Sequence, residues 1–534
     1  RSFQWENTIS YDFTIKEHNF SALLGQSIEK HGLGENISGQ NMGSLFDSFD
    51  YAYLNNVKTI VPGKTLVGGS PTGESAISSF FGRVNYNFKE TYLASVILRT
   101  DGSSNFARGN RWGYFPSVSL GWVISNEAFM DNTKIWMDFL KIRASWGQNG
   151  NQAVSPFQYL ATYSFDASDY FFGTDKNAWS TGAYPSILPN KDITWERSEQ
   201  LDLGLDARFL SSRLGVTFDW YKKTTKDWLV QAPILGSQGA AAPYINGGDV
   251  TNKGVELSLT WNDMVGDFSY GVNANLAVNK NKITRIANSE GVIEGTNPGF
   301  GDGQPPIYRA QVGYPIGYFY GLKTAGVFQN QEQIDNYEGA MLSGTAPGDL
   351  IFVDMNKDGV IDMADRTMIG DPNPNMNLGL TVNLGYKGFD FSVTANGVFG
   401  NQIASSFHKV NHYKENYPSV LLGRWHGEGT SNRYPRLTAD SSPNFMQFND
   451  IYIDNGDFLR IQNVTLGYDF KKLFPKMILQ QARLYVTVQN LYTFTGYYGS
   501  DPEIGTAPEG WSKGVDSGFY PIPRTVLVGA NIKF

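Results

Sequence analysis

The chain of 534 residues contains no cysteine, which excludes disulfide bonds and thiolate metal sites. It has five histidines, so imidazole-based centres have few candidate ligands. No apolar run approaches the roughly 18 residues that a transmembrane helix requires. The net charge of -8 argues against a nucleic-acid partner, because binding to phosphates requires a basic surface.

Aromatic residues are abundant, at 14% of the chain, and they lie in segments where apolar and polar residues alternate. In the last segment the apolar set is Val526, Val528, Ala530, Ile532 and Phe534, interleaved with Thr525, Leu527, Gly529, Asn531 and Lys533. A period of two places the two sets on opposite faces of a β-strand.

The same alternation recurs along the chain, for example in residues 193–209, 255–261, 268–276 and 378–387. Strands of a soluble β-sandwich also alternate between apolar and polar residues, so one such segment does not distinguish a sandwich from a membrane barrel. The large number of segments favours the barrel. The polar set is rich in Asn, Thr, Gly and charge, which a sandwich core could not bury, and aromatics lie near segment ends, as in membrane barrels. The sequence therefore predicts an all-β fold, a transmembrane antiparallel β-barrel, in one domain over residues 1–534.

About fifteen strands are predicted. Their ranges are residues 3–15, 18–31, 76–88, 92–105, 111–125, 138–149, 193–210, 213–231, 251–264, 268–286, 375–387, 389–406, 457–470, 482–498 and 524–534. Short turns alternate with long connections at 32–75, 150–192, 232–250, 287–374, 407–456 and 499–523. Because bacterial barrels have short periplasmic turns and longer outer loops, we expect extracellular long loops and a periplasmic C-terminus.

The first fifteen residues already have a strand pattern and lack the features of a secretory signal. An outer-membrane protein must be exported. We therefore expect the chain to be the C-terminal part of a longer polypeptide.

Ordered motifs occur at residues 99–106 (RTDGSSNF), 113–122 (GYFPSVSLGW), 126–130, 140–151, 219–228, 252–257, 457–468, 489–495 and 501–503. Together they resemble the SusC-like (SusC/RagA) TonB-dependent transporters of Bacteroidetes, over nearly the whole chain. The resemblance implies a barrel of about 22 strands closed by a plug domain. The plug, the TonB box and the first strands would then lie outside this chain.

The resemblance also implies partners. These are a SusD-like surface lipoprotein that forms a lid, TonB acting through the missing plug region, and an oligosaccharide or peptide substrate in a barrel embedded in outer-membrane lipid. Many members form a dimer of transporter–lid pairs.

An EF-hand-like pattern lies at residues 354–365, within a long connection that we expect to be extracellular. Candidate oxygen ligands for Ca²⁺ recur at the spacing of a calcium loop, with Gly359 at its sharp turn: Asp354, Asn356, Asp358, the carbonyl of Val360, Asp362 and Asp365. The last ligand is Asp where Glu is usual, and flanking helices are not evident. The alternatives are a structural calcium site and a turn-rich loop that carries no ion.

The connection at 150–192 is rich in aromatic residues, including Phe157, Tyr159, Tyr163, Phe172 and Tyr184. Such side chains could pack on other loops or a protein lid, or stack on a substrate. His408 and His412 have an i, i+4 spacing but no third ligand nearby, which favours solvated loop histidines.

No catalytic motif is present: the sequence has neither a Gly-x-Ser-x-Gly elbow nor His-Glu-x-x-His. We therefore do not expect an enzyme. The leading functional hypothesis is active import of a bulky nutrient. The alternatives are a passive porin and a surface adhesin or receptor barrel.

Overall fold

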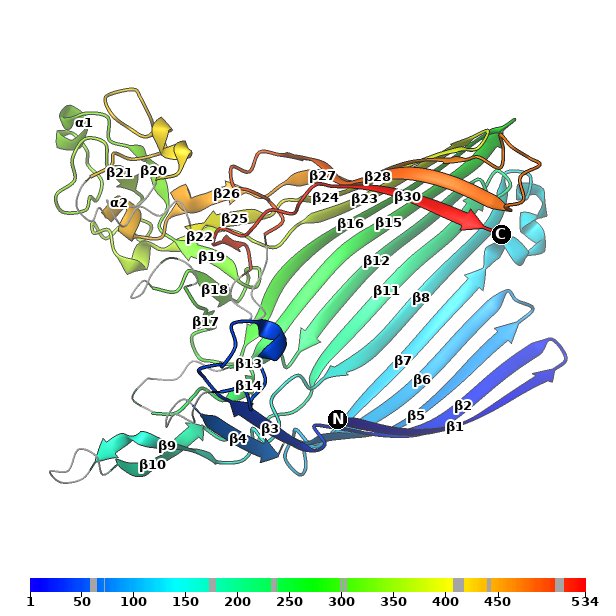
Figure 1. Cartoon of the computed structure of the whole chain (residues 1–534), viewed down its shortest axis with the longest axis horizontal. Helices are drawn as coiled ribbons and strands as arrows, with labels where there is room; N and C mark the ends of the chain where they lie inside the picture. Colours follow the sequence, from blue (N-terminus) through cyan, green and yellow to red (C-terminus); the bar gives the residue numbers. More distant parts are fainter. Residues whose placement is uncertain are drawn as a thin grey trace. The chain divides into compact units, whose positions relative to one another are not determined.

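The computed structural model describes residues 1–57, 65–71, 73–171, 179–231, 237, 239–297, 300, 305–406, 417–438, 443–504 and 513–534 (Figure 1). It is nearly all β. Fifteen strands form one sheet, in which hydrogen-bonded neighbours follow the order of the sequence. Their bounds are β1 Ser2–Ile15, β2 His18–His31, β5 Ser75–Phe88, β6 Tyr92–Ser103, β7 Trp112–Val123, β8 Met137–Asn151, β11 Glu196–Phe209, β12 Leu214–Lys226, β15 Gly248–Val265, β16 Phe268–Ile286, β23 Met376–Tyr386, β24 Phe389–Phe399, β27 Phe458–Asp469, β28 Gln481–Thr495 and β30 Thr525–Lys533.

The fifteen predicted strands are confirmed, but the predicted ranges of two of them extend beyond the observed strands. The range 213–231 breaks at Asp227 (φ 56°), and 389–406 breaks at Gly400 (φ 79°). A positive φ redirects the chain out of the large sheet. The alternation of side chains continues past each break, so sequence periodicity could not locate it.

Shorter strands fill the long connections. They are β3 Glu35–Gln40, β4 Leu66–Pro71, β9 Thr162–Phe171, β10 Trp179–Ile187, β13 Leu229–Gln231, β14 Tyr244–Asn246, β17 Val292–Glu294, β18 Tyr308–Gln311, β19 Tyr318–Gly321, β20 Thr324–Val327, β21 Leu350–Phe352, β22 Thr367–Gly370, β25 Gln402–Ser405, β26 Ile453–Asn455 and β29 Val515–Asp516, with helices α1 Gln331–Asp335 and α2 Pro443–Met446. Apart from β13 and β25, which lie inside the predicted ranges 213–231 and 389–406, none was predicted. Most of them have two to four residues, too few to leave a detectable periodicity, while β3, β4, β9 and β10 are longer and were missed as well. Neither α-helix, nor any other helix in the described ranges, is long and apolar enough to span a membrane.

The sequence predicts short turns at Lys16–Glu17, Lys89–Thr91, Ser211–Ser212, Val265–Asp267 and Lys387–Phe389, and backbone geometry confirms them. Lys16, Lys89, Gly266 and Lys387 have φ between 45° and 59° at the tips of hairpins. Tight two-residue hairpins favour such left-handed residues because their twist matches that of the flanking strands. These turns fix the register, for example Ile15 opposite His18.

The chain divides into two compact units. The first comprises residues 1–120, 146–199 and 226–247, and has a small core of Phe106, Phe115, Val154, Ile193 and Trp195. The second comprises the remaining residues and contains a larger cluster, the loop core, which includes Tyr308, Phe319, Phe352, Phe448 and Tyr452. The connection at 287–374 contributes much of this cluster and is therefore a folded subdomain.

Rows of side chains across β12, β15 and β16 show two chemically distinct faces. One row joins Phe218, Leu257 and Leu276, and the next row along joins Thr217, Ser258 and Asn275. Paired residues share a face of the sheet. We call these the apolar face and the polar face.

Phe534 lies on the apolar phase of the last strand and is 84% exposed. We predict that Phe534→Asp reduces the amount of heat-modifiable, membrane-inserted protein, because a charge on the lipid face is unfavourable. Lys533→Asp, on the opposite face, is the matched control. Equal insertion of wild type and Phe534→Asp would rule out a role for the terminal aromatic in assembly.

Candidate functional site

The polar face of the second unit carries a charged cluster centred on Arg143 of β8. Its guanidinium lies 2.6 Å from Asp219, 3.1 Å from Asp206 and 3.5 Å from Asp202, measured between nitrogen and carboxylate oxygen. Three carboxylates thus surround one cation, and the Arg143 side chain remains 31% exposed. Charges that are not fully neutralised require water, so this face cannot lie against hydrocarbon.

A glycine makes room for this cluster. A Cβ built on Gly204, on the strand between Arg143 and Asp219, would lie 2.5 Å from Cζ of Arg143. The same arrangement recurs at Gly467, where a Cβ would lie 2.7 Å from Nε of Arg483, which bonds to Asp390 at 2.8 Å. In both places an ion pair joins the two outer strands of a triplet and crosses over a glycine on the middle one.

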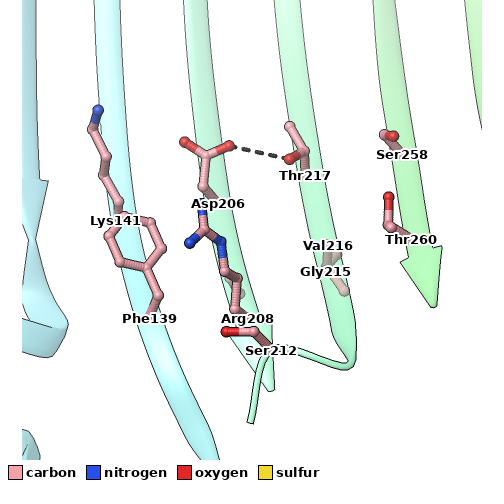
Figure 2. Close-up of a pocket in the computed structure, with 11 residues that line it drawn as sticks. Phe139, Lys141, Asp206, Arg208, Ser212, Gly215, Val216, Thr217, Ser258 and Thr260 are labelled. Carbon is pink, nitrogen blue, oxygen red and sulfur yellow. Dashed lines mark hydrogen bonds between the residues drawn. The ribbon is translucent and has the colours of Figure 1, made fainter. Parts of the chain in front are cut away.

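A cavity of about 620 Å³ lies on the same polar face (Figure 2). Charged and hydroxyl side chains dominate its lining: Lys141, Asp206, Arg208, Ser212, Thr217, Ser258 and Thr260. Thr217 donates a hydrogen bond to Asp206 at 3.2 Å, and the Arg208 guanidinium lies 5.1 Å from the ring centroid of Phe139. Donors and acceptors of both charges could bind hydroxyl or peptide groups of a polar solute.

The alternation of the sequence also predicts a wet inner face that includes Asn273, Asn275, Asp202, Asp206, Arg83 and Asn85. Of these, Asp202, Asp206, Asn273 and Asn275 lie on the polar face of the second unit. The sequence pattern did not identify Arg143 as the centre of the cluster. The available signal was a glycine at 204 in phase with the polar residues of its strand, next to a strand with an arginine.

The predicted calcium loop lies between β21 and β22. Its carboxylates accept hydrogen bonds from the loop's own amides: Asp354 from Gly359 at 2.9 Å, and Asp358 from Val360 at 2.9 Å. Gly359 has a φ of 87°, as a sharp turn requires. The amide of Gly359 also holds the pKa of Asp354 below its usual value, since hydrogen bonding stabilises the charged carboxylate.

The end of the loop is buried. Asp365 is fully inaccessible and accepts hydrogen bonds from the amides of Met355 and Asp362, each at 2.8 Å. Asp362 in turn accepts one from Ala364. Within the described residues no three acidic or histidine side chains converge in a metal-binding arrangement. The chemistry of the donors fits calcium, whereas their oxygens are directed at backbone amides.

The loop core anchors this segment. Asp349, just before β21, is nearly buried and accepts hydrogen bonds from Arg436 and Asn444, both at 2.8 Å. A buried carboxylate with this many donors ties together segments that are distant in sequence. The calcium-loop candidate therefore begins from a fixed strand.

The aromatic connection 150–192 forms the β9–β10 hairpin, in which Tyr163 pairs with Pro185. Tyr163 is 60% exposed and Tyr184 is 47% exposed, while the rings of Phe157 and Tyr159 lie 6.3 Å apart. Exposed aromatics are available to a partner or solute. Phe172, His408 and His412 lie outside the described residues.

The family model described as "TonB dependent receptor-like, beta-barrel" matches residues 1–359. The chain belongs to this family. It is 32% identical to TonB-dependent receptor P3 of Formosa agariphila, covering 99% of this chain and 52% of that protein. It is 31% identical to TonB-dependent receptor SusC of Bacteroides thetaiotaomicron, covering 99% of this chain and 50% of that protein.

Among solved structures, the RagAB peptide transporter superposes with a TM-score of 0.80 at 25% identity, covering 99% of this chain and 55% of that chain. These comparisons confirm the resemblance and the barrel fold, and they assign the chain to a family of outer-membrane proteins. The relatives are named as receptors and transporters, and none of these names is that of an enzyme. The chain spans about half the length of the curated relatives it matches.

We predict that Gly204→Ala destabilises the protein by about 1–3 kcal/mol, because the added methyl group overpacks the Arg143 guanidinium. Gly215→Ala is the matched control. It lies on the polar face of the next strand, and its Cβ would make an ordinary 3.6 Å contact with Thr260. The stability of both variants is measured by denaturant unfolding in detergent. Equal unfolding midpoints for Gly204→Ala and Gly215→Ala would show that the Arg143 side chain moves aside without loss of stability.

Proposed function

We propose that this chain is the C-terminal part of the barrel of an outer-membrane importer for a bulky nutrient, an oligosaccharide or a peptide. The observation that supports this most is the polar face with the Arg143 cluster and the adjoining 620 Å³ cavity. A wet, hydrogen-bonding inner wall suits the passage of a polar solute, and SusC and the RagAB peptide transporter are close in fold or sequence over almost all of the chain.

The other components of the transport complex are part of this proposal. A plug on the N-terminal side closes the lumen and couples it to TonB, and a SusD-like lipoprotein covers the mouth. The long connections are extracellular, the C-terminus is periplasmic, and the exposed aromatics of the β9–β10 hairpin contribute to docking of the lid. Two transporter–lid pairs assemble as a dimer.

The porin and adhesin alternatives differ from this proposal in energy coupling. A porin of 16–18 strands leaves an open aqueous channel, whereas a barrel of about 22 strands holds a plug. An adhesin needs neither TonB nor transport. Energy coupling therefore separates the importer from both alternatives, and uptake separates the porin from the adhesin.

The test is uptake of labelled oligosaccharides and peptides by cells that express the full-length protein, with and without TonB, together with isolation of the native complex in mild detergent. We expect uptake to require TonB and a surface lipoprotein to accompany the barrel. Uptake independent of TonB by a barrel isolated alone would favour the porin. Adhesion of the cells without uptake, with no lipoprotein in the isolated complex, would favour the adhesin.

We further propose that the 354–365 loop binds a structural calcium ion. Its support is the spacing of the oxygen ligands and the left-handed turn at Gly359, on a segment fixed by the loop core. Binding requires the carboxylates to exchange amide hydrogen bonds for the ion, which also relieves repulsion between them.

We predict one divalent ion per chain in the purified protein, and faster proteolysis of this loop after chelation. Asp358→Ala removes a ligand, and Gly359→Val denies the turn its left-handed conformation, so both should mimic chelation. Asp335→Ala, an acidic residue of α1 outside the loop, is the control. Metal-free protein with unchanged proteolysis would identify the segment as a turn without an ion.

A further inference from the structure

Four lysines lie together on the apolar face of the sheet. Lys222 of β12 pairs with Lys253 of β15, which pairs with Lys280 of β16, so the three form one continuous row across adjacent strands (Figure 1 shows these strands side by side). Lys282 lies two residues further along β16, opposite Thr251. All four are exposed, and we call them the lysine row.

These charges lack counter-ions in the described chain. Two nearby cations are paired: Lys226 bonds to Glu199 at 2.5 Å, and Arg285 bonds to Asp249 at 2.9 Å. No described carboxylate forms an ion pair with a member of the lysine row. Like charges directly opposite one another destabilise a sheet. An external anion bound between these lysines would reduce their repulsion.

The position of the row is specific. The row before it joins Trp220, Val255 and Val278 and is the last apolar row on all three strands. On this face of β15 the next charged residue after Lys253 is Asp263, and the two are separated by about 34 Å of strand at about 3.4 Å per residue. With a strand tilt of about 40°, this separation corresponds to about 26 Å across the membrane, close to the height of the apolar band of membrane barrels. The lysine row thus lies where hydrocarbon gives way to lipid headgroups.

We propose that the lysine row is a binding site for the phosphate of a membrane lipid headgroup. Ammonium groups bind phosphate as point charges, and the flexible stems of Lys222, Lys253 and Lys280 can run along the apolar surface while their charges converge. Thr224 in the next row is partly exposed and supplies a further hydroxyl group, which lies 3.2 Å from that of the buried Thr251. In the proposed orientation the lipid belongs to the outer leaflet.

The test uses the full-length protein in detergent, with bound lipid counted by native mass spectrometry. The probes are phosphatidic acid, phosphatidylcholine and inorganic phosphate. We expect wild type to retain phosphatidic acid in preference to phosphatidylcholine. The Lys222→Gln, Lys253→Gln, Lys280→Gln triple variant should lose occupancy about tenfold or more, because each lysine contributes to attraction of an anionic headgroup.

The matched control is Lys223→Gln, which lies next to Lys222 on the polar face, opposite Asn252; it should retain the lipid. The triple arginine variant should also retain it, and Lys253→Gln alone provides a milder test if the triple glutamine variant fails to assemble. Unchanged occupancy in the assembled glutamine variants, or equal retention of both lipids, would overturn the proposal. Displacement of phosphatidic acid by millimolar inorganic phosphate would assign the row to free phosphate, and loss of a bound protein with unchanged lipid would assign it to a protein interface.

Discussion

The structure depends on the pairing of backbone groups in the fifteen-stranded sheet. In hydrocarbon an unpaired amide or carbonyl costs several kcal/mol, so a membrane-spanning sheet must pair its strands along their length. The ladder from Ser2–His31 to Gln481–Lys533 meets this requirement strand by strand. Once the ladder is fixed, the period of two leaves one face for lipid and the other for water.

Charge is distributed according to this division. On the polar face, ion pairs span three strands and cross over Gly204 or Gly467, which keeps the charged groups close to the backbone. On the apolar face, the lysine row begins only where the apolar rows end. The same residue types therefore have different roles on the two faces: neutralisation within the wall on one, and contact with headgroups at its border on the other.

The sequence predicted the large sheet well because each of its strands is long enough to repeat the alternation several times. It failed at Asp227 and Gly400, where the backbone turns while the alternation persists. It also missed the loop core, since residues such as Tyr308 and Tyr452 are brought together from segments far apart in the chain. The Arg143 cluster was only partly predicted, because periodicity assigns a residue to a face but does not identify its neighbours on other strands.

The division into a wet face and a lipid face can be tested by the accessibility of engineered cysteines. The chain has none of its own, so Ser258→Cys, Leu259→Cys and Thr260→Cys can each be made on one strand in an otherwise cysteine-free protein. A charged, water-soluble maleimide is then applied to isolated outer membranes. The account predicts labelling at 258 and 260, and at 259 only after the protein is denatured out of lipid. Equal labelling of all three positions in intact membranes would contradict it.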